Sequence, residues 1–183
     1  MATKFWRSKL LESNAREVYA IHEAGHAVMA VILGCHIEAQ LLEPAGYGAN
    51  GVCHMFGWLS YEEDLLVTLA GPEAEFLVSG DRYGAWGDHE ETHKLTAKRY
   101  SRLNRRARRR LKAHGFRSVN QMADRDYDVA YAKIDAMLEQ YREAIEELAY
   151  RMRYTGWIST NDVLVAMGHD LSYSDVPTEY EYE

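Results

Sequence analysis

Ala20-Ile21-His22-Glu23-Ala24-Gly25-His26-Ala27-Val28 is the stretch from which the rest of the chain can be interpreted. Residues four apart on a helix lie about 40° apart around its axis and one turn along it, so His22 and His26 can reach one ion. Glu23 lies at the edge of the same face, where its carboxylate can hold a water that the ion polarises. This is the arrangement of zinc peptidases. A core helix whose histidines make ordinary hydrogen bonds is the alternative, but Ala24 and Gly25 between them are small and uncharged, which favours a buried metal site.

The helix that carries this motif is predicted to begin near Asn14 and to end near Gly34. Asn14 and Glu17 have the spacing of a capping box, and apolar residues recur on one face up to Ile32. Glycine is favoured just past a helix end, which suits Gly34. Both histidines are therefore expected in a rigid helix interior.

Length and composition predict one folded domain over residues 1–169. The chain has 183 residues, 47% of them hydrophobic, and four tryptophans. Residues 170–183 hold five acids, three tyrosines and a proline, and are predicted to be a flexible acidic tail. No long apolar run predicts a membrane span or a secretory signal. With only two cysteines, a reducing, cytoplasmic setting is expected.

Two short apolar segments, residues 37–42 and 51–56, flank a turn-rich stretch and predict a two-stranded hairpin. Its edge could pair with an extended substrate, or the hairpin could simply cover the helix. A second helix is expected over residues 60–80, with Ser60 and Glu63 as capping box and a kink or break near Pro72. The fold class predicted is mainly α with a small β-hairpin or sheet.

Three carboxylates are candidates for a third metal ligand: Glu73 and Glu75 in the second helix, and Asp88 at the start of a third. Each has an ordinary alternative, because Glu73 and Glu75 could be helix surface residues and Asp88 is a natural N-cap. Residues 89–93 repeat the pattern as His89-Glu90-Glu91-Thr92-His93, but their extra charge favours a solvated helix face. Cys53 and His54 are adjacent on a predicted strand and point to opposite faces, which disfavours them as joint ligands.

A basic block interrupts an otherwise acidic chain. Residues 98–112 contain nine Lys or Arg and no acid, whereas the remaining residues carry 12 basic and 28 acidic side chains. On one helix the nine would spread around most of the circumference. Nucleic acid, an acidic partner chain or the chain's own tail could neutralise them, and surface or intramolecular pairing is the favoured interpretation. Nucleic-acid binding is therefore an alternative, not the expectation.

The C-terminal part is predicted to be helical again. A continuous row of apolar residues predicts a helix over residues 125–153, which residues 156–159 interrupt. A short last helix is predicted over residues 161–167, with Ser159 or Thr160 as its N-cap.

In this order the segments resemble the peptidase domain of the FtsH-type membrane proteases over about residues 14–168. His22 to His26 match the family's His-Glu-Ala-Gly-His helix, and a hairpin follows it. Leu69-Ala70-Gly71-Pro72-Glu73-Ala74-Glu75 and Gly84-Ala85-Trp86-Gly87-Asp88-His89 resemble two later motifs, the second of which supplies an aspartate ligand in the family. The resemblance thus implies a zincin-like helical metallopeptidase domain with His22, His26 and Asp88 on Zn²⁺, Glu23 as general base, and Glu75 as a second-shell group or alternative ligand.

The departures from that family shape the functional expectation. The chain has no ATPase module, no phosphate-binding loop and no membrane helix, and Pro72, Glu73 and Gly87 differ from the usual residues. We expect an ATP-independent peptidase that acts on peptides or unfolded protein segments and that could form homo-oligomers. The alternative is a non-catalytic zinc-containing adaptor or regulator that binds a protein or nucleic acid through its basic block.

Overall fold

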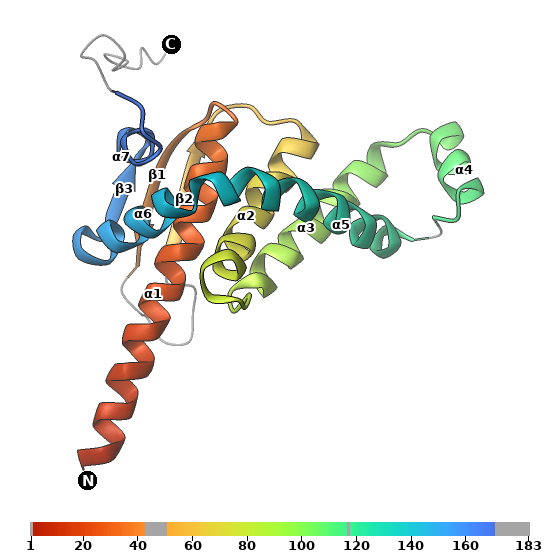
Figure 1. Cartoon of the computed structure of the whole chain (residues 1–183). Helices are drawn as coiled ribbons and strands as arrows, with labels where there is room; N and C mark the ends of the chain where they lie inside the picture. Colours follow the sequence, from red (N-terminus) through yellow and green to blue (C-terminus); the bar gives the residue numbers. More distant parts are fainter. Residues whose placement is uncertain (1, 43–50, 117, 171–183) are drawn as a thin grey trace.

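The computed structural model describes residues 2–42, 51–116 and 118–170 and is mainly helical, with one small antiparallel sheet (Figure 1). The predicted fold class is confirmed at this level. Among the described helices, none combines the length and the apolar character that crossing a bilayer requires.

Helix α1 spans Ala2–Ile32 and carries the His-Glu-x-x-His motif in its second half. The predicted start near Asn14 is wrong: Asn14 lies inside the helix. Residues 2–13 contain neither glycine nor proline, so nothing stops the helix from extending past a residue that could have capped it. The predicted end is confirmed, because Gly34 adopts a φ of 81° and the N–H of Cys35 closes on the carbonyl of Ala30.

The predicted hairpin is present as β1 (His36–Leu41) and β2 (Gly51–Phe56), paired antiparallel. The turn-rich stretch between them, 43–50, lies outside the described residues. A third strand, β3 (Trp157–Ser159), was not predicted and pairs antiparallel with the other edge of β1, giving the order β2-β1-β3. Three residues are too few to show the alternation of apolar and polar side chains that identifies a strand. From the sequence, these residues could therefore be predicted only as a break between two helices.

Helix α2 (Tyr61–Ser79) has the predicted capping box, in which Ser60 accepts from the N–H of Glu63 and the Glu63 side chain accepts from the N–H of Ser60. Pro72 lies inside this helix and does not break it. Helix α3 (Ala85–Arg102) begins earlier than predicted, with Gly84 as N-cap, so Asp88 is not the cap and lies in the first turn.

The basic block is divided between two helices, the end of α3 and α4 (Arg105–Ala113), because Asn104 caps α4 by accepting from the N–H of Ala107. The continuous helix predicted over residues 125–153 is also two elements, α5 (Val119–Leu138) and α6 (Arg142–Thr155), joined by a 3₁₀ turn over Glu139–Tyr141. The apolar residues continue across the junction between α5 and α6, where Leu138 and Ile145 are both fully buried. The hydrophobic pattern therefore gave no sign that the helix is interrupted there. Helix α7 (Thr160–Ala166) is capped by Ser159, one of the two caps predicted.

The core surrounds the second half of α1, which packs against α2, α6 and the sheet. The first half of α1 extends away from the other elements in Figure 1. Small residues face the partners of α1: Ala20, Ala24, Ala27 and Ala30 are fully buried. Because these side chains are small, α2 can pack closely against α1. As a result, α2 and the loop that leads into α3 lie next to the two histidines.

Candidate metal centre

Three side chains from two helices converge: His22 and His26 from α1, and Asp88 from the first turn of α3. Their candidate ligand atoms all lie within 4.8 Å of one another. The two Nε2 atoms are 2.9 Å apart, and Asp88 lies 3.1 Å from Nε2 of His22 and 3.5 Å from Nε2 of His26. Zn–N and Zn–O bonds of about 2.0–2.1 Å in a tetrahedron require ligand atoms about 3.3 Å apart. The geometry therefore fits a zinc-sized ion with little adjustment.

The outer nitrogens of both imidazoles are held by the protein. Nδ1 of His26 lies 2.7 Å from the carbonyl of Val67, which can only accept, so His26 is the donor. Nδ1 of His22 lies 2.5 Å from Oε1 of Glu75, a carboxylate that likewise accepts. In the neutral imidazoles both Nε2 atoms then carry lone pairs, and these face each other and Asp88. Such a set of converging lone pairs needs a cation, which is the main reason that the residues suit a metal.

Without a metal, a proton serves as that cation. Burial alone would lower the pKa of His22, but hydrogen bonds to Asp88 and Glu75 outweigh burial and raise the pKa to about 10. For Asp88, burial would raise the pKa, yet the same hydrogen bonds to His22 and His26 lower it well below its usual range. Both shifts show that the site favours positive charge at its centre.

Glu75 links three parts of the site. Its side chain is almost fully buried, accepts from His22 and also accepts from the N–H of Gly84 at 2.9 Å. Because Gly84 is the N-cap of α3, this bond fixes the turn that delivers Asp88. Glu75 thus occupies the orienting position, while Glu73 turns away to pair with Arg82 at 2.6 Å. Of the three carboxylates that the sequence left in contention, only Asp88 lies in the cluster.

Glu23 is buried beside the cluster, with its carboxylate against the start of β2. A Cβ atom placed on Gly51 would lie 2.5 Å from Oε1 of Glu23, so a larger residue there would have to displace the Glu23 carboxylate. Burial raises the pKa of Glu23, an effect that the positive charge of His26 and His22 partly opposes. A carboxylate made more basic by burial can accept a proton from water more readily.

Gly71 is a second close contact and was not singled out as a site residue from the sequence. A Cβ there would lie 2.5 Å from Nε2 of His26 and 2.7 Å from Nε2 of His22. The glycine therefore lets α2 form one wall of the site. The signals in the sequence were Pro72 next to it and the resemblance of the segment from Leu69 to Glu75 to a family motif.

The second His-Glu-x-x-His does not form a comparable cluster. Nε2 of His89 lies 2.8 Å from the hydroxyl of Tyr131, His93 lies edge-on to Tyr127, and Glu90 and Glu91 pair with Lys94. Cys53 and His54 are not among the converging ligands. Burial, with a smaller effect of the Glu23 carboxylate, raises the pKa of the Cys53 thiol to about 12. Over the described ranges, the one group of three potential metal ligands is His22, His26 and Asp88.

Comparisons with known proteins do not place this site in a family: no protein-family model matches the chain, and no curated protein matches it either.

Proposed function

We propose that the chain is a zinc metallopeptidase that hydrolyses peptide bonds in peptides or unfolded segments without ATP. The observation that carries this proposal is the convergence of His22, His26 and Asp88 beside a buried Glu23. The sequence resemblance to the FtsH-type peptidase domain supports it, as does the position of both histidines in the buried second half of α1. A cytoplasmic setting belongs to the same proposal, since the thiols of Cys35 and Cys53 are both free.

Zinc bound to these three side chains would supply an open position for water and lower the pKa of that water toward about 7. Glu23 accepts the proton of the attacking water and then transfers it to the leaving amine of the peptide. Glu75 holds His22 in the tautomer that presents Nε2 inward, and the carbonyl of Val67 does the same for His26. The chain thus contributes ligands, a base and their orientation.

The test compares wild type with Glu23→Gln on an unfolded reporter such as labelled casein. We expect Glu23→Gln to retain zinc and to lose about 10²–10⁴-fold in hydrolysis rate, since it removes a general base and leaves the ligands. Chelation followed by zinc addition should abolish and restore wild-type cleavage. Equal rates in both proteins, or no metal-dependent cleavage of any flexible substrate by zinc-loaded wild type, would exclude the peptidase.

A non-catalytic adaptor is the second candidate, and the basic block favours it. Of its nine cations, only Arg99 makes an ion pair with an acid of the described chain, to Glu62 at 2.7 Å. Among the described residues, the expected ion pairs between the basic block and acids of the same chain are thus nearly absent. Pairing with the acidic tail concerns residues 171–183, which lie outside the described residues. An adaptor would keep the zinc cluster for stability and use these cations for a partner, so Glu23→Gln would leave its binding unchanged.

A further inference from the structure

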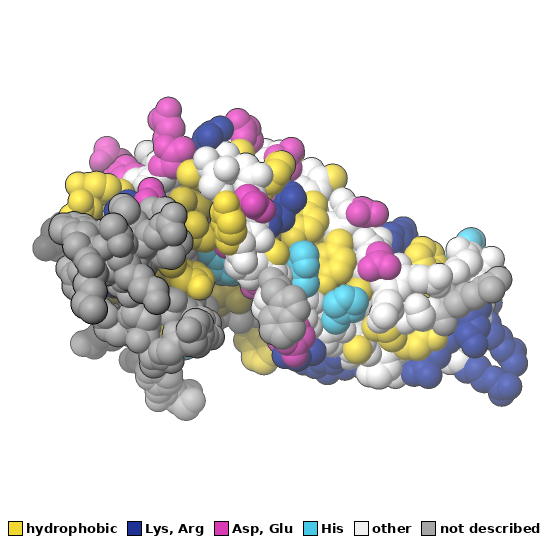
Figure 2. Space-filling view, turned by 90° about the horizontal axis from the view of Figure 1, so that it is seen from below, with side chains coloured by type: hydrophobic (Ala, Val, Ile, Leu, Met, Phe, Trp, Pro, Cys, Tyr) yellow, Lys and Arg dark blue, Asp and Glu magenta, His cyan; other side chains and the backbone are white. Residues whose placement is uncertain are grey.

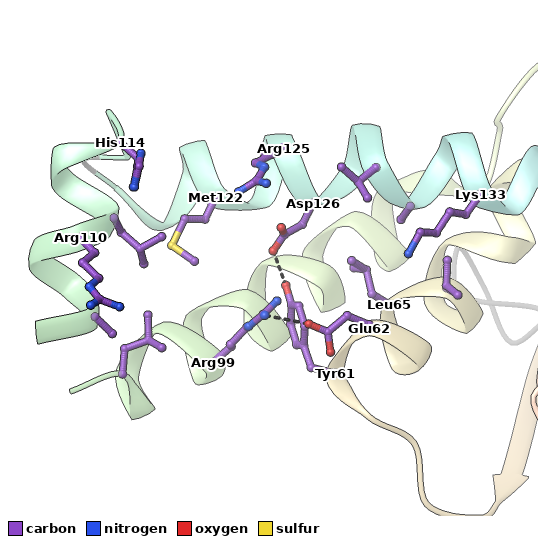
Figure 3. A pocket seen from close by; sticks show the side chains of 16 residues that line it. Tyr61, Glu62, Leu65, Arg99, Arg110, His114, Met122, Arg125, Asp126 and Lys133 are labelled. Carbon is purple, nitrogen blue, oxygen red and sulfur yellow. Dashed lines mark hydrogen bonds and ion pairs between the residues drawn. The ribbon is translucent and has the colours of Figure 1, made fainter.

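A cavity of about 550 Å³ lies between α2, α3, α4 and α5 and is not lined by any residue of the metal cluster (Figure 3). Its large apolar side chains come from α2, α4 and α5 and from the residue that follows α3: Leu65, Leu66, Leu103, Leu111, Met122 and Val129. This size lies in the range of about 300–1,000 Å³ that is usual for sites that bind ligands or side chains. We call it the arm groove, because α4 forms its outer wall.

Cations without acidic partners surround the arm groove. Arg110 of α4 and Arg125 and Lys133 of α5 line it, and no ion pair joins any of the three to an acid of the described chain. Figure 3 shows them spread around the cavity, with Arg110 at the α4 end and Lys133 at the other. Two acids also line the arm groove: Glu62 pairs with Arg99, and Asp126 accepts from the hydroxyl of Tyr61 at 2.7 Å and keeps its charge. The net charge of the lining is nevertheless positive, because Arg99, Arg110, Arg125 and Lys133 outnumber these two carboxylates.

Helix α4 is poorly anchored to the body. None of its residues is buried, and two of its apolar side chains, Ala107 and Leu111, line the arm groove. Figure 2 shows a cluster of basic side chains at one end of the molecule, and Figure 1 shows α4 as the outermost helix at that end. An occupant that contacts both the apolar lining and the cations would give α4 the packing that it lacks.

The sequence contains one segment with the matching chemistry. Residues 170–183 carry five acids and no Lys or Arg, and they end in Glu179-Tyr180-Glu181-Tyr182-Glu183. In an extended segment this alternation puts the carboxylates on one side and the tyrosine rings on the other. The rings suit the apolar lining, and the carboxylates suit the surrounding cations.

We propose that the arm groove binds the acidic segment 170–183 of a second copy of this chain. We assign the segment to a second copy because α7, which precedes it, and α4 lie at opposite ends of the molecule in Figure 1. The contact joins two different surfaces, so it links copies head to tail. It does not depend on the proposed peptidase activity.

Nucleic acid is the rival occupant of a basic surface, and the arm groove disfavours it. The apolar side chains that line it offer no hydrogen-bond donors to phosphate oxygens, whereas they can pack against the tyrosine rings of the acidic segment. A polyanion would instead spread over the whole basic block, including Arg106, which does not line the arm groove.

The test measures binding of a labelled synthetic peptide of residues 170–183 to the full chain by fluorescence anisotropy. We expect saturable binding that weakens about tenfold in Arg110→Glu and remains unchanged in Arg106→Glu, a matched charge reversal on the same exposed helix. A peptide with Tyr180→Ser and Tyr182→Ser should also bind about tenfold more weakly, since it keeps all five acids and loses the rings.

Sedimentation of the full chain provides the second measurement. We expect wild type to associate in a concentration-dependent manner, and we expect a chain ending at Asp170 and Arg110→Glu both to lose this association. No peptide binding at low salt would overturn the proposal. Equal losses in Arg106→Glu and Arg110→Glu, with tight binding of an oligonucleotide, would overturn it in favour of a general polyanion surface.

Discussion

Gly71 sets how closely α2 can approach the histidine pair. In Gly71→Ala the added methyl would lie within 2.7 Å of both Nε2 atoms, where the ion must bind. We expect zinc content after purification to fall to near zero while helicity by circular dichroism is kept. Gly87→Ala is the matched control, since a Cβ there meets nothing within 4 Å, and it should retain zinc. Full zinc occupancy in Gly71→Ala would show that the ion does not bind between these nitrogens.

Glu75 and Glu73 provide a second comparison at the scale of single residues. In Glu75→Gln, an amide replaces a carboxylate whose two oxygens accept from His22 and Gly84. The amide has only one acceptor oxygen and no charge, so it can satisfy these two donors less well. Zinc affinity should drop about 10–100-fold, as for other groups that orient a ligand histidine. Glu73→Gln should leave affinity unchanged and lower only thermal stability, because its partner is Arg82. Competition with a chromophoric chelator measures both affinities, and identical affinities for the two variants would contradict the orienting role of Glu75.

Helix α7 depends on Asp162, which accepts from the N–H and hydroxyl of Ser159 and pairs with Arg151. Burial would raise the pKa of Asp162, but these bonds outweigh it and lower the pKa. Because the pKa is lower in the folded state, the ionised carboxylate stabilises the fold at pH values above its unfolded-state pKa of about 3.9. This stabilisation is lost as the pH falls through the folded-state pKa.

Asp162→Asn should therefore lower the free energy of unfolding by about 1 kcal/mol at pH 7, in the range of a lost helix cap. The difference from wild type should shrink as the pH is lowered below about 4, when the wild-type carboxyl also becomes neutral. Urea unfolding across this pH range measures it, with the exposed Glu147→Gln as control. A loss that is the same at pH 3 and pH 7 would mean that the charge of Asp162 is irrelevant.

The elements differ in how far the sequence could predict them. The α1 histidines and the Ser60 capping box follow from local spacing, so their placement was predictable. The choice between Glu73 and Glu75 was not. Glu73 and Glu75 are two residues apart and therefore point about 200° apart around α2, so only one of them can face α1. Which one does so depends on the rotation of α2 about its axis, which is set by tertiary packing at Gly71. The start of α1 was missed because a capping residue permits a helix start without requiring one.

At the scale of the whole molecule, the cluster connects α1 to α3 across more than sixty residues of sequence. Zinc that binds the folded state alone should raise stability by about 2.7 kcal/mol at a free concentration of 100 times Kd. We expect a zinc-dependent rise in the thermal midpoint by calorimetry that EDTA reverses. Asp88→Ala should show a much smaller rise, since one of its three ligands is missing. An undiminished shift in Asp88→Ala would place the ion elsewhere.

The third strand has a consequence for how the chain must be synthesised and folded. Ile158 pairs across from Ala39, and the hydroxyl of Thr160 accepts from the N–H of Ile37 at 2.7 Å, so β1 is completed by residues some 120 positions later. Until the ribosome has released them, β1 has one open edge, and open edges are where chains add to one another and aggregate. A nascent chain arrested before Trp157 should therefore need a chaperone that the finished protein does not.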